Sequence, residues 1–408
     1  MKSNMKQKLM ILGGSKYILP IINEAHRMDV YTITCDYLPD NIAHKYSDEY
    51  CNVSILDKDA VLEKAADLGI NGIMSFACDP GVTTAAYVAE KIGLPSVGSY
   101  EAVSILQDKG LFRDFLKKNG FNTPNAKRYE RAEDVFSDIE FFNWPVIVKP
   151  TDSAGSKGVV KVDKPEGLKE AVNVAKEYSH NGAIIVEDFL KQEGFSSDSD
   201  CFSVDGKMVF YSFSSQRFDD VAENPYTPAA FSWPSSMSKE NIDYLKKEMQ
   251  RLISLLGLKT SIYNIETRQC VNGKPYIMEF SPRGGGNRLS EVIKMGTGVD
   301  LLSSSIKAAL GMKIDDIKQK EFEGFWGEII LHSKKPGIFK SLSISREIKE
   351  NIVERDLWIK KGDKVGGFKG ANESVGTLVL KFDSKKRMEN VINNIDEYVE
   401  VVLEDEIK

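Results

Sequence analysis

Short apolar runs alternate with longer amphipathic segments over the first hundred residues of the chain. The apolar runs have the length of buried strands, and the longer segments space their apolar residues three or four positions apart, as helices do. The predicted strands are residues 8–12, 30–36 and 72–77, and the predicted helices are residues 18–28, 59–68 and 82–92. Strands separated by helices favour a doubly wound α/β sheet, which we assign to residues 1–107.

The turn after the first predicted strand contains two glycines, in Gly13-Gly14-Ser15-Lys16, but lacks the full Gly-x-Gly-x-x-Gly fingerprint of a dinucleotide site. Asp36 stands near the end of the second strand, where such a site places its ribose-binding acid. Because the fingerprint is incomplete, a nicotinamide-linked oxidoreductase is disfavoured. We expect this turn to approach a small substrate or only to reverse the chain.

The remainder of the chain is richer in strands. A helical segment over residues 108–120 ends at a glycine, which is a common helix stop. The further predicted strands are residues 144–150, 158–162, 183–187, 200–204 and 207–214, and the further helices are residues 239–256 and 288–310. Residues 215–240 are polar and contain prolines, so we expect a long loop there of the kind that is usually functional or mobile.

Length and composition exclude several classes of protein. At 408 residues the chain exceeds one hydrophobic core, and it contains no apolar run of membrane-spanning length. The five cysteines and four histidines are scattered, which disfavours a zinc site, a disulfide framework or a histidine-based centre and fits a reducing cytoplasm. A net charge of −6 without a long basic run disfavours a nucleic-acid partner. We therefore expect a multidomain cytoplasmic protein that binds neither nucleic acid nor membrane.

Two glutamates are the most informative residues of the chain. Asn272-Gly273 is the dipeptide most favourable for a two-residue hairpin turn, and β-prone runs flank it on both sides. Counting outward from that turn pairs Glu266 with Glu279, and Asn264 with Ser281, on one face of the hairpin. Carboxylates opposite each other, with Cβ atoms about 5 Å apart, destabilise a sheet. Mg²⁺ removes that penalty, so the pair predicts a magnesium site, against the alternative of a solvated hairpin with incidental acids.

A second informative segment begins at Lys149, where a predicted strand runs into a loop of small residues. Glycines and serines let backbone N–H groups approach an anion, and the lysine adds a positive charge. The loop residues concerned are Ser153, Gly155, Ser156 and Gly158. The spacing is not that of a Walker loop, and the alternative is a flexible hairpin tip. The segment predicts a phosphate-binding loop.

A third segment is an apolar strand that ends at Glu187 and leads to Leu190. Such a strand end offers an apolar slot with backbone donors and acceptors, which suits an adenine. The order of the three segments is more specific than any one of them. Lys149 and its loop would hold the phosphates. The glutamate pair would hold Mg²⁺ (or Mn²⁺), and residues 187–190 would hold the adenine. Arg283 would neutralise charge on a transferred phosphoryl group.

This arrangement resembles the ATP-grasp superfamily, in the branch of biotin carboxylase and carbamoyl phosphate synthetase. The resemblance implies a preATP-grasp domain at 1–107, two ATP-grasp lobes at 108–185 and 186–312, and a small α+β domain at 313–408. It also implies ATP and magnesium as cofactors. The residues that match the family's pattern are a helix lysine, Lys109, a strand lysine, Lys149, the loop from Ser153 to Gly158, the hinge residues Glu187 and Leu190, the metal acids Glu266 and Glu279, and the catalytic Arg283.

The sequence departs from the family's pattern at two places. The family usually has an asparagine two residues after the second metal acid, where this chain has Ser281, and we expect its cross-strand partner Asn264 to help hold the ion. The ribose-binding acid after the hinge does not align cleanly, and Glu193 is our choice for it. Asn287 and Arg288, with Arg217 as a weaker candidate, are expected to contact substrate, Arg288 by clamping a carboxylate.

The resemblance implies an enzyme that phosphorylates a carboxylate with ATP and passes the acyl phosphate to an amine. Its partners would then be a small acid and an amine, and a homodimer is compatible because dimers are common among similar enzymes. One alternative is a purine-pathway enzyme with a phosphoribosyl substrate, which requires more phosphate-binding groups than Lys16 provides. The other is a regulatory protein that binds Mg-ATP without catalysis.

Overall fold

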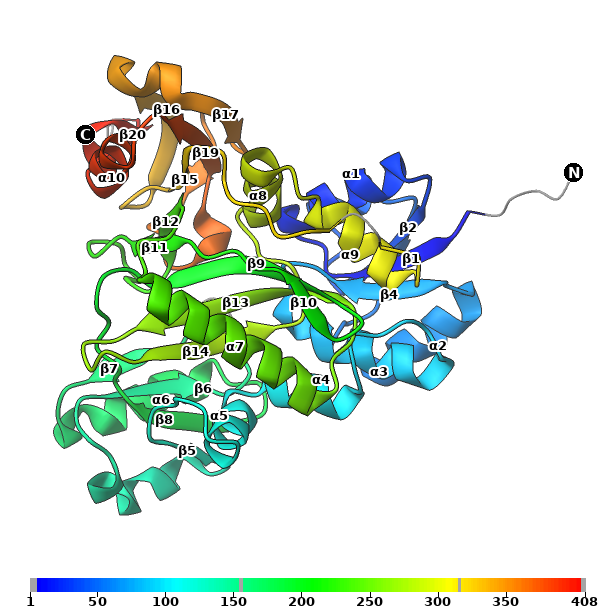
Figure 1. The fold of residues 1–408 in the computed structure, drawn as a ribbon, viewed down its shortest axis with the longest axis horizontal. Coiled ribbons are helices and arrows are strands. Elements are labelled where there is room, and N and C mark those ends of the chain that lie inside the picture. The colour runs from blue at the N-terminus through cyan, green and yellow to red at the C-terminus, as the bar shows by residue number, and fades with distance from the viewer. Residues whose placement is uncertain (1–5, 154–156, 315–316, 405–408) are drawn as a thin grey trace, which may run out of the picture.

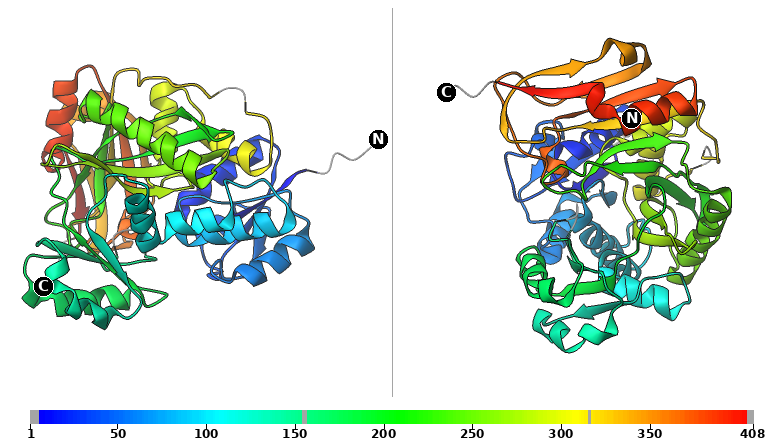
Figure 2. Two further views of the ribbon diagram at one scale, coloured as in Figure 1. Left: turned by 60° about the horizontal axis from the view of Figure 1, so that its bottom comes forward. Right: turned by 90° about the vertical axis from the view of Figure 1, so that its left-hand side faces the viewer.

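The computed structural model describes residues 6–153, 157–314 and 317–404. These residues form five sheets with helices packed against them, which confirms a multi-sheet α/β and α+β architecture (Figure 1). Figure 2 shows the C-terminal strands, in orange and red, and the lobe of residues 126–188, in teal, at opposite ends of a central green sheet. None of the helices in these ranges is long and apolar enough to cross a membrane.

The first sheet is parallel and has the strand order β3-β2-β1-β4. Its strands are β1 (Lys8–Leu12), β2 (Tyr31–Cys35), β3 (Glu49–Cys51) and β4 (Gly72–Ser75), and its helices are α1 (Leu19–Arg27), α2 (Lys58–Leu68) and α3 (Val82–Ile92). Successive residues of β1 serve different cores: Leu9 and Ile11 pack with α1, whereas Met10 and Leu12 pack with α2 and α3. Covering both faces is what a parallel sheet requires, and it confirms the doubly wound prediction.

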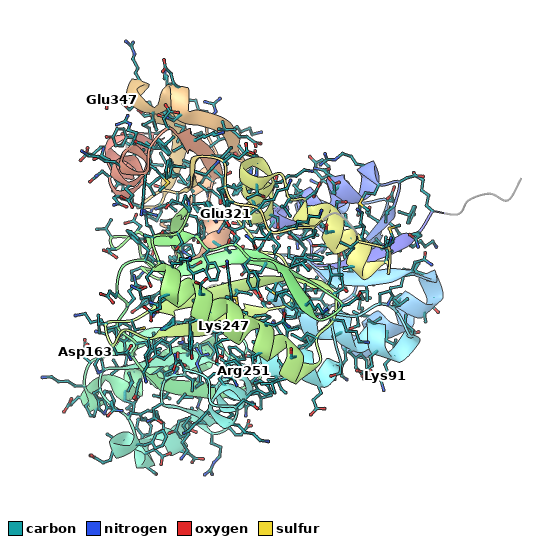
Figure 3. The ribbon with its side chains drawn as sticks, viewed as in Figure 1. Lys91, Asp163, Lys247, Arg251, Glu321 and Glu347 are labelled. Carbon is teal, nitrogen blue, oxygen red and sulfur yellow. The ribbon has the colours of Figure 1, made fainter. Side chains whose placement is uncertain are left out.

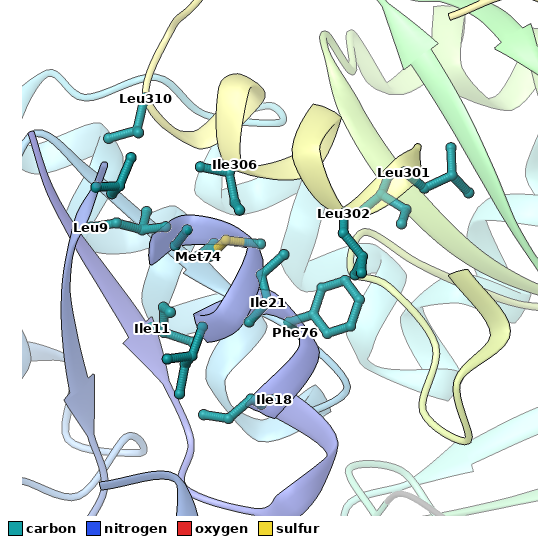
Figure 4. Close-up of a cluster of buried hydrophobic side chains, with 14 of the residues drawn as sticks. Leu9, Ile11, Ile18, Ile21, Met74, Phe76, Leu301, Leu302, Ile306 and Leu310 are labelled. Carbon is teal, nitrogen blue, oxygen red and sulfur yellow. The ribbon is translucent and has the colours of Figure 1, made fainter. Parts of the chain in front are cut away.

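The chain returns to this first sheet after the central part of the molecule. The predicted helix over 288–310 is divided into α8 (Leu289–Thr297) and α9 (Leu301–Ala309), because Gly298 ends α8 with a left-handed φ of 75°. Leu302 and Ile306 of α9 pack with α1 and with β1 in one buried cluster (Figure 4). The first sheet is thereby fixed to the segment that carries Arg283 and Arg288.

The next two helices lead into an antiparallel sheet of order β5-β8-β6-β7. The helices are α4 (Tyr100–Gln107) and α5 (Lys109–Lys118), and the strands are β5 (Ala126–Tyr129), β6 (Val146–Pro150), β7 (Val160–Val162) and β8 (Ile184–Asp188), with α6 (Leu168–Glu177) between the last two. Asp108 caps α5 by accepting hydrogen bonds from the backbone of Gly110 and Leu111. This cap fixes the position of Lys109 at the first turn of the helix.

The central sheet is antiparallel, with the order β10-β9-β13-β14. Its strands are β9 (Ser197–Val204), β10 (Lys207–Phe210), β13 (Ser261–Gln269) and β14 (Pro275–Ser281), and α7 (Lys239–Leu256) covers one face. Leu245 and Met249 of α7 are buried against the sheet, whereas Lys247 lies on the exposed face of the helix (Figure 3). This amphipathic pattern explains why residues 239–256 were predictable as a helix.

The C-terminal part contains a five-stranded sheet, β11-β12-β15-β19-β17, and a three-stranded sheet, β18-β16-β20. The strands are β11 (Ser215–Phe218), β12 (Pro228–Trp233), β15 (Phe325–Leu331), β16 (Gly337–Ile344), β17 (Ile352–Leu357), β18 (Lys364–Val365), β19 (Gly376–Phe382) and β20 (Val399–Leu403), with the helix α10 (Lys385–Asn393). The prediction of a long loop over residues 215–240 is therefore wrong where β11 and β12 form. Residues 229–233 are buried against β15, a partner that local sequence does not reveal.

Candidate functional site

The structure pairs the two informative glutamates across β13 and β14. Glu266 lies opposite Glu279, and Asn264 opposite Ser281, as the sequence predicts. The turn is different from the predicted one, since Gln269 pairs with Pro275 rather than with Tyr276, the partner that a two-residue turn at Asn272-Gly273 would give it. An irregularity between Glu266 and Thr267 restores the predicted register beyond it. The glutamate pairing was thus correct although the two-residue turn was not.

Positive side chains lie beside the glutamate pair. Lys109 Nζ is 3.8 Å from Glu279 Oε1, and Arg268 Nη2 is 3.4 Å from Glu266 Oε1. The two glutamate side chains remain 39% and 29% exposed, so an incoming ligand has access to their oxygens. Lys109 also donates to the carbonyl of Ser153, which ties α5 to the start of the predicted phosphate loop. Carboxylates and lysine therefore converge where the sequence predicts metal and phosphate.

Asn264 and Ser281, the other two predicted metal ligands, already have protein partners. Asn264 Oδ1 accepts from Arg283 Nη1 at 2.8 Å, and Ser281 Oγ donates to Asp79 Oδ1 at 2.9 Å. Among residues 6–153, 157–314 and 317–404, no three His, Cys, Asp or Glu side chains are grouped as a metal site. The chemistry of paired carboxylates fits Mg²⁺, and the ligand set stays a prediction that rests on Glu266 and Glu279.

Arg283 is held by an acid from the first domain. Its Nε and Nη2 both donate to Asp79 at 2.8 Å, in the bidentate geometry that fixes a guanidinium plane. Burial by itself would raise the pKa of Asp79, but Arg283 outweighs it and lowers that pKa. Asp79 was not among the predicted site residues. A carboxylate after the fourth strand of a doubly wound sheet was the available signal, because ligands bind at that edge.

A second missed acid lies on β9, next to the glutamate pair. Asp198 pairs with Glu266 across the sheet and accepts from Asn264 Nδ2 at 2.7 Å. Its neighbour on the same face, Asp200, accepts from the backbone of Gly285 and from Ser290 Oγ, and so anchors the segment that follows Arg283. The alternation of serine and aspartate over residues 197–200 was the sequence signal, since it places both acids on one face of a strand.

Asp198 predicts a measurable pH dependence of stability. Burial and the adjacent Glu266 raise its pKa from 3.8 to about 8. The folded state then binds a proton that the unfolded chain has lost, so this contribution to the free energy of unfolding falls as pH rises between about 4 and 8. Asp198→Asn should remove it and unfold at higher urea than the parent at pH 9, but not at pH 4. At roughly 1.4 kcal/mol per pKa unit the gain reaches several kcal/mol.

The exposed acid Asp67, replaced by asparagine, provides the control for this pH dependence because it makes the same chemical change on the surface of α2. It should leave the pH profile of unfolding unchanged. A profile for Asp198→Asn that runs parallel to that of the parent protein from pH 4 to pH 9 would show that Asp198 is ionised in the folded state.

Lys149 is not a free cation in this structure. It forms an ion pair with Glu187 on the neighbouring strand β8, and Arg113 Nε donates to the other oxygen of Glu187 at 2.9 Å. Burial would raise the pKa of Glu187, but Arg113 and Lys149 lower it to about 2. Glu187 therefore remains ionised and holds Lys149 in place beside the predicted loop, of which Gly155 and Ser156 lie outside the described residues.

The remaining nucleotide-site predictions fall on backbone or surface positions. The carbonyl of Leu190 accepts from Arg268 Nη1 at 3.4 Å, which links the predicted adenine hinge to the strand that carries Glu266. Glu193 has an exposed side chain, and its backbone N–H donates to the carbonyl of Gln269. Gly158 adopts a left-handed φ of 70°, as the end of a tight loop requires. A ribose-binding role for Glu193 stays a prediction.

The predicted substrate arginines have different surroundings from those expected. Arg217 is buried and donates to Ser232 Oγ and to Asn393 Oδ1 on α10, so its guanidinium joins structural elements. Arg288 Nη2 lies 2.8 Å from Glu291, and its Nη1 lies 2.9 Å from Glu354 and 3.8 Å from Asp356. Three carboxylates therefore already surround the guanidinium that was expected to clamp a substrate carboxylate.

Comparison with known proteins identifies the domain that carries most of the candidate site. Residues 142–291 match the model of the ATP-grasp domain. These residues form a domain of the ATP-grasp superfamily. Ligases of this superfamily use ATP with Mg²⁺. The match covers the strands from β6 to β14, which carry Lys149, Glu187, Glu266 and Glu279.

A curated relative of this ATP-grasp protein is the large chain of carbamoyl phosphate synthase from Thermotoga neapolitana. The two are 24% identical over 251 residues, which is 61% of this chain but only 22% of the relative. Two solved structures share the fold over 98% of the chain. They are an L-amino acid ligase from Bacillus licheniformis (TM-score 0.78, 20% identity, 99% of that chain) and phosphoribosylglycinamide synthetase from Anaerococcus prevotii (TM-score 0.75, 21% identity, all of that chain).

Proposed function

We propose that this protein is an ATP-dependent carboxylate–amine ligase. It would transfer the γ-phosphoryl group of ATP to a small carboxylic acid or amino acid, and an amine would then displace phosphate from the acyl phosphate to form an amide. The observation that supports this most directly is the Glu266–Glu279 pair beside Lys109, within the segment that matches the ATP-grasp domain. Like charges at this spacing are retained most readily where a divalent cation neutralises them.

Each charged side chain of the proposed site has a separate role in this reaction. Lys109 and Lys149, with the loop from Ser153 to Gly158, would bind the phosphates, and Glu187 would keep Lys149 in position. Glu266 and Glu279 would hold Mg²⁺, which when bound offsets the negative charge of the phosphates. Arg283, its plane fixed by Asp79, would stabilise charge on the transferred phosphoryl group. The loop backbone would limit access of water to the acyl phosphate.

The surroundings of Lys16 favour this proposal over a phosphoribosyl substrate. Lys16 Nζ donates to the carbonyl of Ser374 at 2.7 Å and lies 4.1 Å from the centre of the Trp358 ring. Burial lowers its pKa to about 8. The one cation that the sequence offered for a phosphoribosyl group is thus already used in joining the first and C-terminal domains.

Release of ADP tests the proposed function. The full chain is incubated with Mg-ATP and with pools of small carboxylic acids, amino acids and phosphoribosyl amines, each pool alone and in pairs. ADP release that requires an acid, and that rises further with an amine, is the expected result. Binding of Mg-ATP without turnover in every pool would instead identify a regulatory nucleotide-binding protein, and turnover only with phosphoribosyl compounds would identify a purine-pathway enzyme.

A further inference from the structure

One buried carboxylate in the C-terminal sheet has no role in the proposed chemistry. Glu328, in the middle of β15, is fully buried, and neither of its carboxylate oxygens has a hydrogen-bond partner among the described residues. A buried carboxyl group without a partner costs free energy, because it has lost water and gained nothing in return. Such a group is a candidate for contact with a bound ligand.

The register of the sheet shows what surrounds Glu328. It lies opposite Phe231 on β12 and Val379 on β19, and Val379 lies opposite Glu354 on β17. One step along the same face, Thr377 lies opposite Asp356, and its buried hydroxyl also lacks a partner. Three unpartnered oxygens, two from Glu328 and one from Thr377, therefore belong to one face of the sheet.

The opposite wall of this region is the start of α8. Leu289 and Val292 of α8 pack with Phe231 and Val379 in one buried cluster. Arg288, the residue that precedes α8, adopts a left-handed φ of 64°, and Asn287 before it has a φ of 51°. The side-chain oxygen of Asn287 is buried and unpartnered as well. Strained residues next to unsatisfied acceptors are typical of ligand-binding positions.

The charged side chains around Glu328 and Arg288 indicate whether a cation or an anion would bind there. Arg288 has Glu291, Glu354 and Asp356 around it, and it also acts electrostatically on Glu328. Burial is the main cause that raises the pKa of Glu328 well above its usual range, Glu291 raises it further, and Tyr17 of the first domain lies close enough to be affected by Glu328. A bound cation would offset the cost of ionising this carboxyl group. One guanidinium thus faces an excess of carboxylates. A cation is favoured here, and a second carboxylate is not.

We propose that Glu328 and Thr377 bind the ammonium group of the amine substrate, as in the α-ammonium group of an amino acid, and that the Glu328 carboxylate takes up the proton that this nitrogen releases before it attacks the acyl phosphate. This assignment rests on the proposed ligase function and deepens it. An ammonium group has three N–H donors, which matches the three unpartnered oxygens of Glu328 and Thr377. The site is joined to the proposed reaction centre by the segment from Arg283 to Ser290, whose ends are held by Asp79 and Asp200.

The test uses hydroxylamine as a nucleophile that is neutral near pH 7.5 and traps acyl phosphates without needing an ammonium site. Hydroxamate formation is measured with Mg-ATP, hydroxylamine and pooled carboxylic acids, and the twenty common L-amino acids are then added singly as competitors. L-Lactate serves as the matched probe for L-alanine, because a hydroxyl group replaces the ammonium group. The proteins compared are the parent chain, Glu328→Gln and the control Glu400→Gln, which alters an exposed glutamate on β20.

Without a competitor, the parent chain and Glu400→Gln should form equal amounts of hydroxamate, and the yield of Glu328→Gln without a competitor serves as its own reference. At least one amino acid should lower the yield in the parent and control proteins, and Glu328→Gln should need about tenfold or more of that amino acid for the same effect. Equal competition in Glu328→Gln and the parent would overturn the ammonium site alone. Absence of hydroxamate from the parent with every acid would overturn the ligase proposal and this site with it.

If Glu328→Gln does not fold, a second measurement on the parent protein tests whether it recognises an ammonium group. The parent protein should discriminate between L-alanine and L-lactate, and between other amino acids and their hydroxy acids, in the same competition. Equal competition by both members of every pair would show that no ammonium group is recognised, and would overturn the proposal without any variant.

Discussion

Glu279→Gln is expected to lower ADP release by about 100-fold or more while the fold is retained. The substitution removes one of the two carboxylates that we assign to Mg²⁺ and replaces it with a neutral side chain of the same size. Glu279 is 39% exposed and faces Glu266, so losing its charge relieves repulsion and does not unpair a buried group. The free energy of unfolding should therefore stay the same or rise slightly.

Turnover and urea unfolding are measured on the same preparations of the parent, Glu279→Gln and Glu63→Gln. Glu63 is exposed on α2, so its variant reports on the chemical change alone. Glu266→Gln and the double variant should be no more than slightly worse than Glu279→Gln, because two ligands of one ion act as a unit. Turnover by Glu279→Gln within twofold of the parent would remove the metal assignment.

Glu187→Gln is expected to have the largest effect on stability, a loss of roughly 3–5 kcal/mol. Glu187 and Arg113 are 3% and 5% exposed, and Lys149 is the second cation on the same carboxylate. Without the negative charge, two buried cations lie beside a neutral amide. The depressed pKa of Glu187, about 2, means that its contribution is present above about pH 4.5 and is lost as pH falls toward 2.

Urea unfolding at pH 7 and pH 3 measures this effect. The parent and Glu187→Gln should differ strongly at pH 7 and less at pH 3. Glu166→Gln, an exposed glutamate in the same lobe, should match the parent within about 0.5 kcal/mol at both values. A difference below 1 kcal/mol at pH 7 would mean that the ion pair with Arg113 and Lys149 does not hold the lobe together.

Regular elements with clear periodicity were predictable from the sequence. The helices of α3 and α7 begin and end where predicted, because their apolar spacing and their closing glycines are local signals. The Glu266–Glu279 register was also predictable, since alternation fixes which residues share a face. The irregularity beside Glu266 was not, because it depends on how β13 packs between two other strands.

Failures of prediction occurred where a distant segment supplies the partner. Residues 215–240 have the composition of a loop, yet β12 forms there because β15, almost a hundred residues later, offers it an edge. Arg288 was expected to bind a substrate carboxylate, but it forms ion pairs with Glu354 and Asp356 of β17. Asp79 and Arg283 are likewise far apart in sequence and joined only by the docking of the first domain.

The sequence by itself determined the elements, the paired glutamates and the lysine-and-glycine segment that together indicate an ATP-grasp protein. Short-range periodicity and the composition of short segments encode these features, so neighbouring residues suffice to predict them. Only the tertiary structure decided which charges neutralise one another: Lys149 with Glu187, Arg283 with Asp79, and Arg288 with three acids. Glu328 stands without a partner for the same reason, since a charge is paired or left unpaired by contacts between distant strands and helices.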